Sequence, residues 1–179
     1  MTQQNITRTP IHTRTIVCEG FLRSDQRWDI DARLTDVKHY PFSTIERGIL
    51  AVGERVHDMT ITLTLNDQLT IEAIVVSMQD VPFKICRKVP PRLEQLVGIN
   101  LTRGWRKEVQ KRLALKEGCT HLTELLRVMA TTAFQTILPY QNRHTQGAKL
   151  IHPNIVNQCQ GFRADDEVIQ QHFPEYADD

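Results

Sequence analysis

The feature that most constrains this fold is a run of strictly alternating side chains on one side of a short turn. Every second residue from Met59 to Leu65 is apolar, and threonines fill the positions between them. After the turn at Asn66-Asp67-Gln68, an apolar run returns over Leu69–Val76. A period of two places successive side chains on opposite faces of a strand. The pattern predicts an antiparallel β-hairpin with one buried and one solvated face.

An earlier hairpin has the same character. Thr15–Arg23 is expected to form a strand, residues 24–27 a turn, and Trp28–Lys38 a long second strand in which apolar and polar residues alternate. The acidic residues of this strand are assigned to its solvated face, where basic neighbours would pair with them. The acidic residues are Asp29, Asp31 and Asp36, and the basic ones are Arg33 and Lys38.

Helical periodicity replaces alternation after Pro90-Pro91. We expect a short helix that closes at Gly98, a second helix over 104–116, and a third that begins with Thr120 as its N-cap and stops at Pro139. The resulting fold class is α+β, an antiparallel sheet of two hairpins followed by helices packed on one face.

A chain of 179 residues is long enough for one domain with a substantial core. The polar residues 1–14 are expected to form a disordered leader, and residues 15–139 a single α+β domain. Residues 140–179 are expected to form a polar loop and a tail that folds back on the domain.

The charge balance indicates the class of partner. Lys plus Arg number 22 and Asp plus Glu 21, which gives a net charge of +1. This balance argues against binding driven by the charge of nucleic acid or of an anionic membrane. No stretch resembles a signal peptide or a membrane span, so a cytoplasmic protein with small-molecule or protein partners is expected.

Residues able to bind metal stand at the ends of three predicted elements. His57 and Asp58 open the second hairpin, Cys86 follows its exit, and Cys119 precedes the third helix. The two ends of a hairpin lie at one edge of a sheet, so His57, Asp58 and Cys86 are expected to be neighbours. Together with Cys119 from the start of the helix, they are predicted to bind zinc or iron. His121 and Glu124, in the first turn of the helix, are candidate catalytic residues.

The other cysteines leave several interpretations open. Cys18 is expected in the core, Cys159 is either a further ligand or a tail residue, and no disulfide is expected in a reducing compartment. One alternative to a metal site is a metal-free enzyme of small-molecule catabolism, with Cys119 as nucleophile or acid and a histidine as base. Another is an accessory protein that binds a partner, in which the cysteines are structural.

Long motifs in four parts of the chain resemble one bacterial family, the domain of unknown function 2889. The motifs are Trp28-Asp29-Ile30-Asp31-Ala32-Arg33-Leu34-Thr35-Asp36, Gly53-Glu54-Arg55-Val56-His57-Asp58-Met59, Gly118-Cys119-Thr120-His121-Leu122-Thr123-Glu124-Leu125-Leu126 with Ala133-Phe134-Gln135, and, in the tail, Asn157-Gln158-Cys159 with His172-Phe173-Pro174. This resemblance covers nearly the whole chain and implies no established activity.

A remoter resemblance is to the iron–sulfur cluster assembly scaffolds. Asp58, Cys86, Cys119 and His121 follow the order of the ligands in that family. Two features depart from its pattern, because His57 stands where the scaffold has a cysteine and an intervening glycine, and because Cys119 and His121 are not adjacent. The resemblance therefore implies a related fold with an altered, mononuclear metal site.

Overall fold

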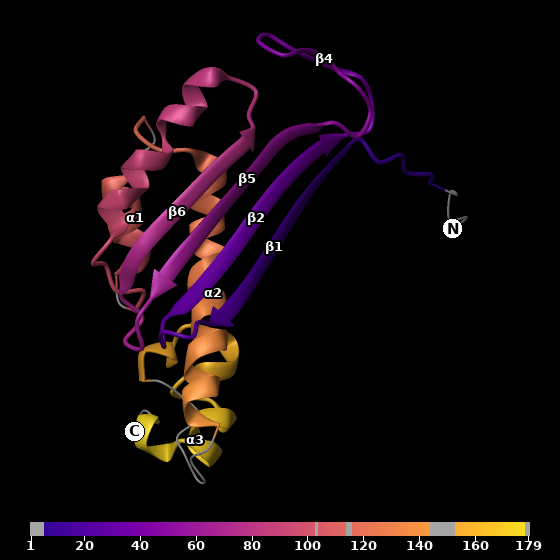
Figure 1. Cartoon of the computed structure of the whole chain (residues 1–179). Helices are drawn as coiled ribbons and strands as arrows, with labels where there is room; N and C mark the ends of the chain where they lie inside the picture. The colour runs from indigo at the N-terminus through magenta and orange to yellow at the C-terminus, as the bar shows by residue number, and fades with distance from the viewer. Residues whose placement is uncertain (1–5, 103, 114–115, 144–152, 178–179) are drawn as a thin grey trace.

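The computed structural model describes residues 6–102, 104–113, 116–143 and 153–177 (Figure 1). Its centre is a four-stranded antiparallel sheet with the strand order β1-β2-β5-β6. The strands are β1 (His12–Leu22), β2 (Trp28–Lys38), β5 (Arg55–Leu65) and β6 (Ile71–Asp80). The two predicted hairpins lie side by side through β2 and β5, and the α+β fold class is confirmed.

The alternating residues of β2 and β5 form the centre of the core. Ile30 stands opposite Leu63, and Ala32 opposite Ile61, and all four side chains are buried. The odd-numbered residues of β2 and the threonines of β5 lie on the other face and are more exposed. The sheet therefore has the one buried and one solvated face that the period of two predicts.

The long helix α2 (Thr120–Asn142) covers the buried face and runs along the sheet (Figure 1). Its apolar side is buried over roughly four turns, through Leu122, Leu125, Leu126, Met129, Ala130, Ala133 and Ile137. The approach to β1 is close, because a Cβ atom at Gly20 would lie 2.1 Å from Oγ1 of Thr136. The absence of a side chain at Gly20 allows α2 to rest directly on the strand.

Both ends of α2 differ from expectation. Cys119, not Thr120, occupies the N-cap position with an extended backbone, and Thr123 donates its hydroxyl hydrogen to the carbonyl of Cys119. Pro139 lies inside the helix, so the predicted stop there is wrong. Two contacts with residues outside the helix stabilise its last turn. Tyr140 packs edge-on against Trp28, and Gln141 donates a hydrogen bond to the carbonyl of Asp67.

Smaller elements surround the sheet. The segment before β5 contains a short hairpin of β3 (Phe42–Thr44) and β4 (Gly48–Leu50) that extends away from the sheet (Figure 1). After β6 come two 3₁₀ helices and α1 (Trp105–Arg112). The 3₁₀ helices, at Lys84–Lys88 and Pro90–Leu96, precede Gly98, which has the positive φ of a C-terminal glycine.

The two ends of the chain differ in how much is described. β1 begins at His12, inside the segment expected to be a leader, because residues 12–14 pair with β2 in register. Of the predicted polar loop, residues 144–152 lie outside the described ranges. The tail contains α3 (Glu167–His172) and three 3₁₀ turns, Pro153–Ile155, Gln160–Phe162 and Pro174–Tyr176. That it folds back on the domain stays a prediction.

No helix in the described ranges is both long enough and apolar enough to cross a lipid bilayer.

Candidate functional site

A row of three polar residues crosses the sheet where the apolar core ends. Arg14 of β1 stands directly opposite Asp36 of β2, and Asp36 stands directly opposite His57 of β5. Directly opposed residues have Cβ atoms about 4.5–5.5 Å apart and point to the same face. The strand pairing alone therefore brings a guanidinium, a carboxylate and an imidazole together.

Asp36 is the centre of this row and is only 1% exposed. Arg14 binds both of its oxygens, with Nε 2.9 Å from Oδ1 and Nη2 2.9 Å from Oδ2. His12 Nε2 lies 3.1 Å from Oδ1. Burial alone would raise the pKa of Asp36, but the hydrogen bonds and charge of Arg14, with smaller effects of His57 and His12, lower it. Asp36 is therefore an anion at neutral pH despite its burial.

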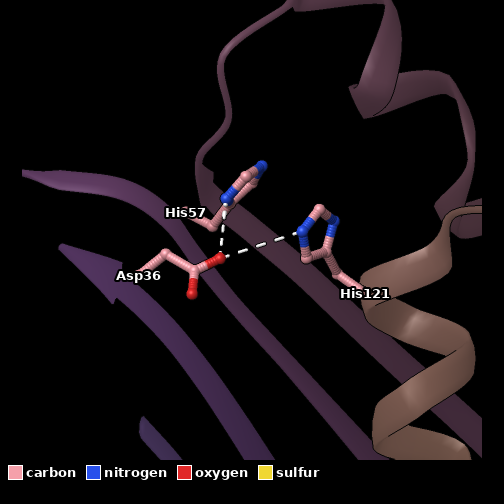
Figure 2. A group of neighbouring side chains, drawn as sticks. All are labelled: Asp36, His57 and His121. Carbon is pink, nitrogen blue, oxygen red and sulfur yellow. Dashed lines mark hydrogen bonds and ion pairs between the residues drawn. The ribbon is translucent and has the colours of Figure 1, made fainter. Parts of the chain in front are cut away.

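The start of α2 adds a second imidazole. His57 Nδ1 lies 2.9 Å from Oδ2 of Asp36, and His121 Nε2 lies 3.8 Å from the same oxygen (Figure 2). The two imidazole rings face each other at a centroid distance of 4.0 Å and an angle of 35°. One ligand atom from each of these three residues lies within 4.8 Å of the other two, an arrangement able to hold a metal ion. We call Asp36, His57 and His121 the triad.

Both histidines of the triad favour the neutral form. Burial, followed by the charge of His121, lowers the pKa of His57 in spite of Asp36. Burial, followed by the charge of Arg14, lowers the pKa of His121. A neutral imidazole has a lone pair free to bind a metal or accept a proton. The site therefore presents one anion and two neutral nitrogen bases.

Cys119 contacts the far side of the His121 ring. Its Sγ lies 3.7 Å from Nδ1, whereas Nε2 of the same ring faces Asp36. When Nδ1 carries the proton, it donates a weak hydrogen bond to Sγ of Cys119. The lone pair of Nε2 then points toward Asp36. Cys119 is thus placed to orient His121, as outer residues do at metal-binding histidines.

Cys86 lies near Cys119 in the 3₁₀ helix Lys84–Lys88, partly buried against the core. Burial, and then the neighbouring Cys119, raise the pKa of its thiol. Cys18 is also partly buried against the core, whereas Cys159 is exposed at the start of a 3₁₀ turn in the tail. All four cysteines are free thiols, and none belongs to the triad.

Asp58 lies on the opposite face of the sheet from His57, because neighbouring residues of a strand point to opposite sides. Its buried carboxylate is held by Arg33, with contacts of 2.9 and 2.7 Å, and by Arg55 at 2.8 Å. The hydrogen bond from Arg33, assisted by the charges of both arginines, lowers the pKa of Asp58 against the effect of burial. The sequence analysis predicted Asp58 as a metal ligand next to His57. In the structure its carboxylate is instead bound by Arg33 and Arg55.

Glu124 lies one turn along α2 from His121 and connects the helix to Arg14 of β1. One of its oxygens lies 2.7 Å from Nη1 of Arg14, and its side chain is 42% exposed. Arg14 thereby bridges Glu124 and Asp36. Glu124 contacts the triad through Arg14, and its charge also acts to raise the pKa of His121 against the effect of burial. Both effects suit a positioning role better than contact with a reacting atom.

Three residues of the site were missed from the sequence, namely Asp36, Arg14 and His12. The assignment of Asp36 to the solvated face is wrong, because it has the same parity as the buried residues Trp28 to Leu34 and continues their face. Extending the alternation by one step would have placed it correctly. Arg14 and His12 fell within the expected leader, and only the pairing of β1 with β2 reveals their position.

Comparison with known families gives one match. The model of a family described as "Protein of unknown function (DUF2889)" matches residues 12–135, which is more than half of the chain. The chain belongs to the DUF2889 family. The DUF2889 match spans the triad together with Arg14 and Glu124, and it ends before the tail. Searches of curated proteins and of solved structures gave no significant match, so the likeness to iron–sulfur scaffolds stays a prediction.

Proposed function

We propose that this DUF2889 protein binds one divalent metal ion, zinc or iron(II), through the triad and carries out chemistry on a small molecule there. The observation that carries the proposal is the convergence of three ligand atoms, from Asp36, His57 and His121, within 4.8 Å of one another. Imidazole nitrogen and carboxylate oxygen suit both metals, and two histidines with one carboxylate is a recurrent set in zinc and non-haem iron enzymes.

The distances are close to those that coordination needs. Metal–nitrogen and metal–oxygen bonds of about 2.0–2.1 Å in a tetrahedron separate neighbouring ligand atoms by roughly 3.3 Å. The two measured separations from Asp36 Oδ2 are 2.9 Å to His57 and 3.8 Å to His121. These values lie on either side of the required one, and the separation of the two imidazole nitrogens is within 4.8 Å, so side-chain movements would complete the coordination.

Three protein ligands leave at least one coordination position for a substrate or water, which is typical of catalytic rather than structural sites. The triad also faces a cleft of about 440 Å³, lined in part by Asp36, His57 and His121. A volume of this order accepts a small organic molecule. We place this activity in the cytoplasm, because reduced cysteines such as the four found here persist in that compartment.

Metal content tests the proposal. Protein purified without oxygen is analysed by elemental mass spectrometry, both directly and after chelation and reloading with zinc or iron(II). We expect about one metal ion per chain in the wild type and in His172→Ala, an exposed histidine of α3 that serves as the control. Asp36→Asn, His57→Ala and His121→Ala should each lose the metal.

Cysteine variants separate the triad from the ligands predicted by sequence. Cys86→Ser and Cys119→Ser should keep the metal if the triad holds it, because neither thiol belongs to the triad. Circular dichroism establishes that each variant is folded. A wild type that binds neither metal, or triad variants that bind it as well as the control does, would overturn the proposal.

A second candidate function is supported by the bonds of Arg14. Both oxygens of Asp36 already accept a hydrogen bond from Arg14, which reduces their attraction for a metal ion. In a metal-free enzyme, Asp36 would orient His57 as a general base, and His121 would act on the Cys119 thiol. Alkylation of Cys119 in chelated protein tests this alternative. The rate at neutral pH should fall in His121→Ala, and an unchanged rate would exclude the thiol–imidazole pair.

A further inference from the structure

The lining of the cleft divides into two chemical groups. One group is charged or polar and includes Arg14, Lys38 and the triad. The other is apolar and comes from three segments, the β3–β4 hairpin, the start of β5 and the chain that follows β6. The apolar group consists of Phe42, Ile45, Val56, Pro82 and Phe83. A ligand that matches both groups has a charged end and an apolar body.

Two of the apolar side chains remain open to solvent. Ile45 is 88% exposed and Phe83 is 41% exposed, although both line the cleft. Large apolar side chains at a cleft lose this contact with water when an apolar ligand covers them, and each square ångström of apolar surface removed contributes to binding. The exposed walls therefore favour a ligand with a hydrocarbon surface.

Lys38 is a cation of the cleft whose charge is not balanced by a carboxylate. Its ammonium lies 5.4 Å from the centroid of the Phe42 ring, and it forms no ion pair with any residue of the described ranges. The other cation of the cleft, Arg14, is neutralised by Asp36 and Glu124. Among the residues that line the cleft, Arg14 and Lys38 are two cations and Asp36 is one anion, so the lining itself carries one net positive charge, next to an aromatic ring. An anion is the ligand that this charge would attract.

We propose that the cleft binds a small carboxylic acid with a compact apolar body, such as an aromatic ring. The carboxylate faces Lys38 and the triad, and the body lies against Phe42, Ile45 and Phe83. This inference rests on the proposed function, because it names the substrate class of the same site. A metal ion held by the triad would add positive charge at the end of the cleft where the carboxylate lies.

Binding of three probes tests the substrate class. Isothermal titration calorimetry compares benzoate with benzamide, which has the ring without the charge, and with acetate, which has the charge without the ring. We expect benzoate to bind at least tenfold more tightly than either, since a bond to a charged group and the burial of a ring are each worth about tenfold or more. Equal affinity for benzoate and benzamide would overturn the inference.

A matched pair of lysine variants tests the site. Lys38→Met keeps an unbranched side chain but removes the charge, and should weaken benzoate binding by about tenfold while leaving benzamide unchanged. Lys107→Met makes the same exchange on an exposed position of α1 and should leave both affinities at the wild-type values. Benzoate affinity that is equal in the two variants would refute the role of Lys38.

The titrations are run on chelated and on zinc-treated protein, which separates this inference from the proposed function. Benzoate binding that depends on Lys38 in protein that takes up no zinc would support the substrate class and overturn the metal site. One zinc per chain without benzoate binding would leave the metal site standing and overturn the substrate class.

Discussion

Replacing Gly20 with alanine tests whether α2 rests on β1 as closely as the structure shows. The new Cβ would lie 2.1 Å from Oγ1, 2.5 Å from Cγ2 and 2.7 Å from Cβ of Thr136. Contacts this short require the strand or the helix to move. Gly20 has no positive φ, so the backbone itself accepts alanine. At such a position alanine would otherwise stabilise the fold by about 0.4–1 kcal/mol, and any loss of stability reports the clash.

We expect Gly20→Ala to lower the free energy of unfolding by about 3 kcal/mol, near the upper end of overpacking costs, because three atoms of one side chain are affected. In a chain of this size such a loss lowers Tm by about 6–12 °C. Urea unfolding followed by circular dichroism measures the first value, and calorimetry the second. The clash would also displace α2, which carries His121, so zinc affinity should fall.

Two further variants distinguish the clash from other causes. Thr136→Ala in the Gly20→Ala background removes the two shortest contacts but leaves the third, and should recover about 1–2 kcal/mol. Gly161→Ala adds a Cβ that meets nothing within 4 Å and should change stability by less than about 0.5 kcal/mol. If Gly20→Ala is as stable as the wild type, the reasoning about the contact between α2 and β1 is wrong.

Three other predictions follow from the described contacts. Arg33 and Arg55 lower the pKa of Asp58, so this ion pair stabilises the fold above the unfolded pKa and its contribution is lost as the pH falls through the lower folded pKa. Asp58→Asn should cost about 2 kcal/mol at pH 7 and flatten the acid side of a stability–pH curve, and a curve with the wild-type slope would contradict this. Burial raises the pKa of Cys18, so mass spectrometry should show its alkylation beginning at higher pH than that of free cysteine in the same solution; equal profiles would contradict it. Zinc at about 100 times its Kd should stabilise the protein by about 2.7 kcal/mol in thermal melts, and His57→Ala should abolish the shift.

The sheet could be predicted from sequence because its signal is local. The alternation predicts both ends of β2 correctly, and it predicts the ends of β5 and β6 to within a few residues. The β3–β4 hairpin was missed because its strands have three residues each, too few for a period to show. Pro139 was misjudged for a different reason, since contacts from Tyr140 and Gln141 outweigh the loss of one helical hydrogen bond.

The site was harder to predict because it depends on pairing between distant residues. Sequence reasoning named His57 as a metal ligand and His121 as a catalytic residue, and the structure brings both next to Asp36. It named Cys119 as a ligand too, but this thiol lies outside the triad and contacts the ring of His121. It chose Asp58 over Asp36 because adjacency in the chain was taken for adjacency in space. Only the register of β2 with β5 shows that Asp36 is the carboxylate opposite His57.

The same register has a consequence for how the chain finds its fold. If β1 slipped by one residue along β2, Thr13 or Thr15 would stand opposite Asp36 in place of Arg14. A carboxylate buried without a cation costs several kcal/mol, so both slipped pairings are strongly disfavoured. β1 is an edge strand whose side chains are mostly exposed, and its apolar residues do little to fix its alignment. Asp36 therefore specifies which pairing of the first two strands is productive, before any ligand is bound.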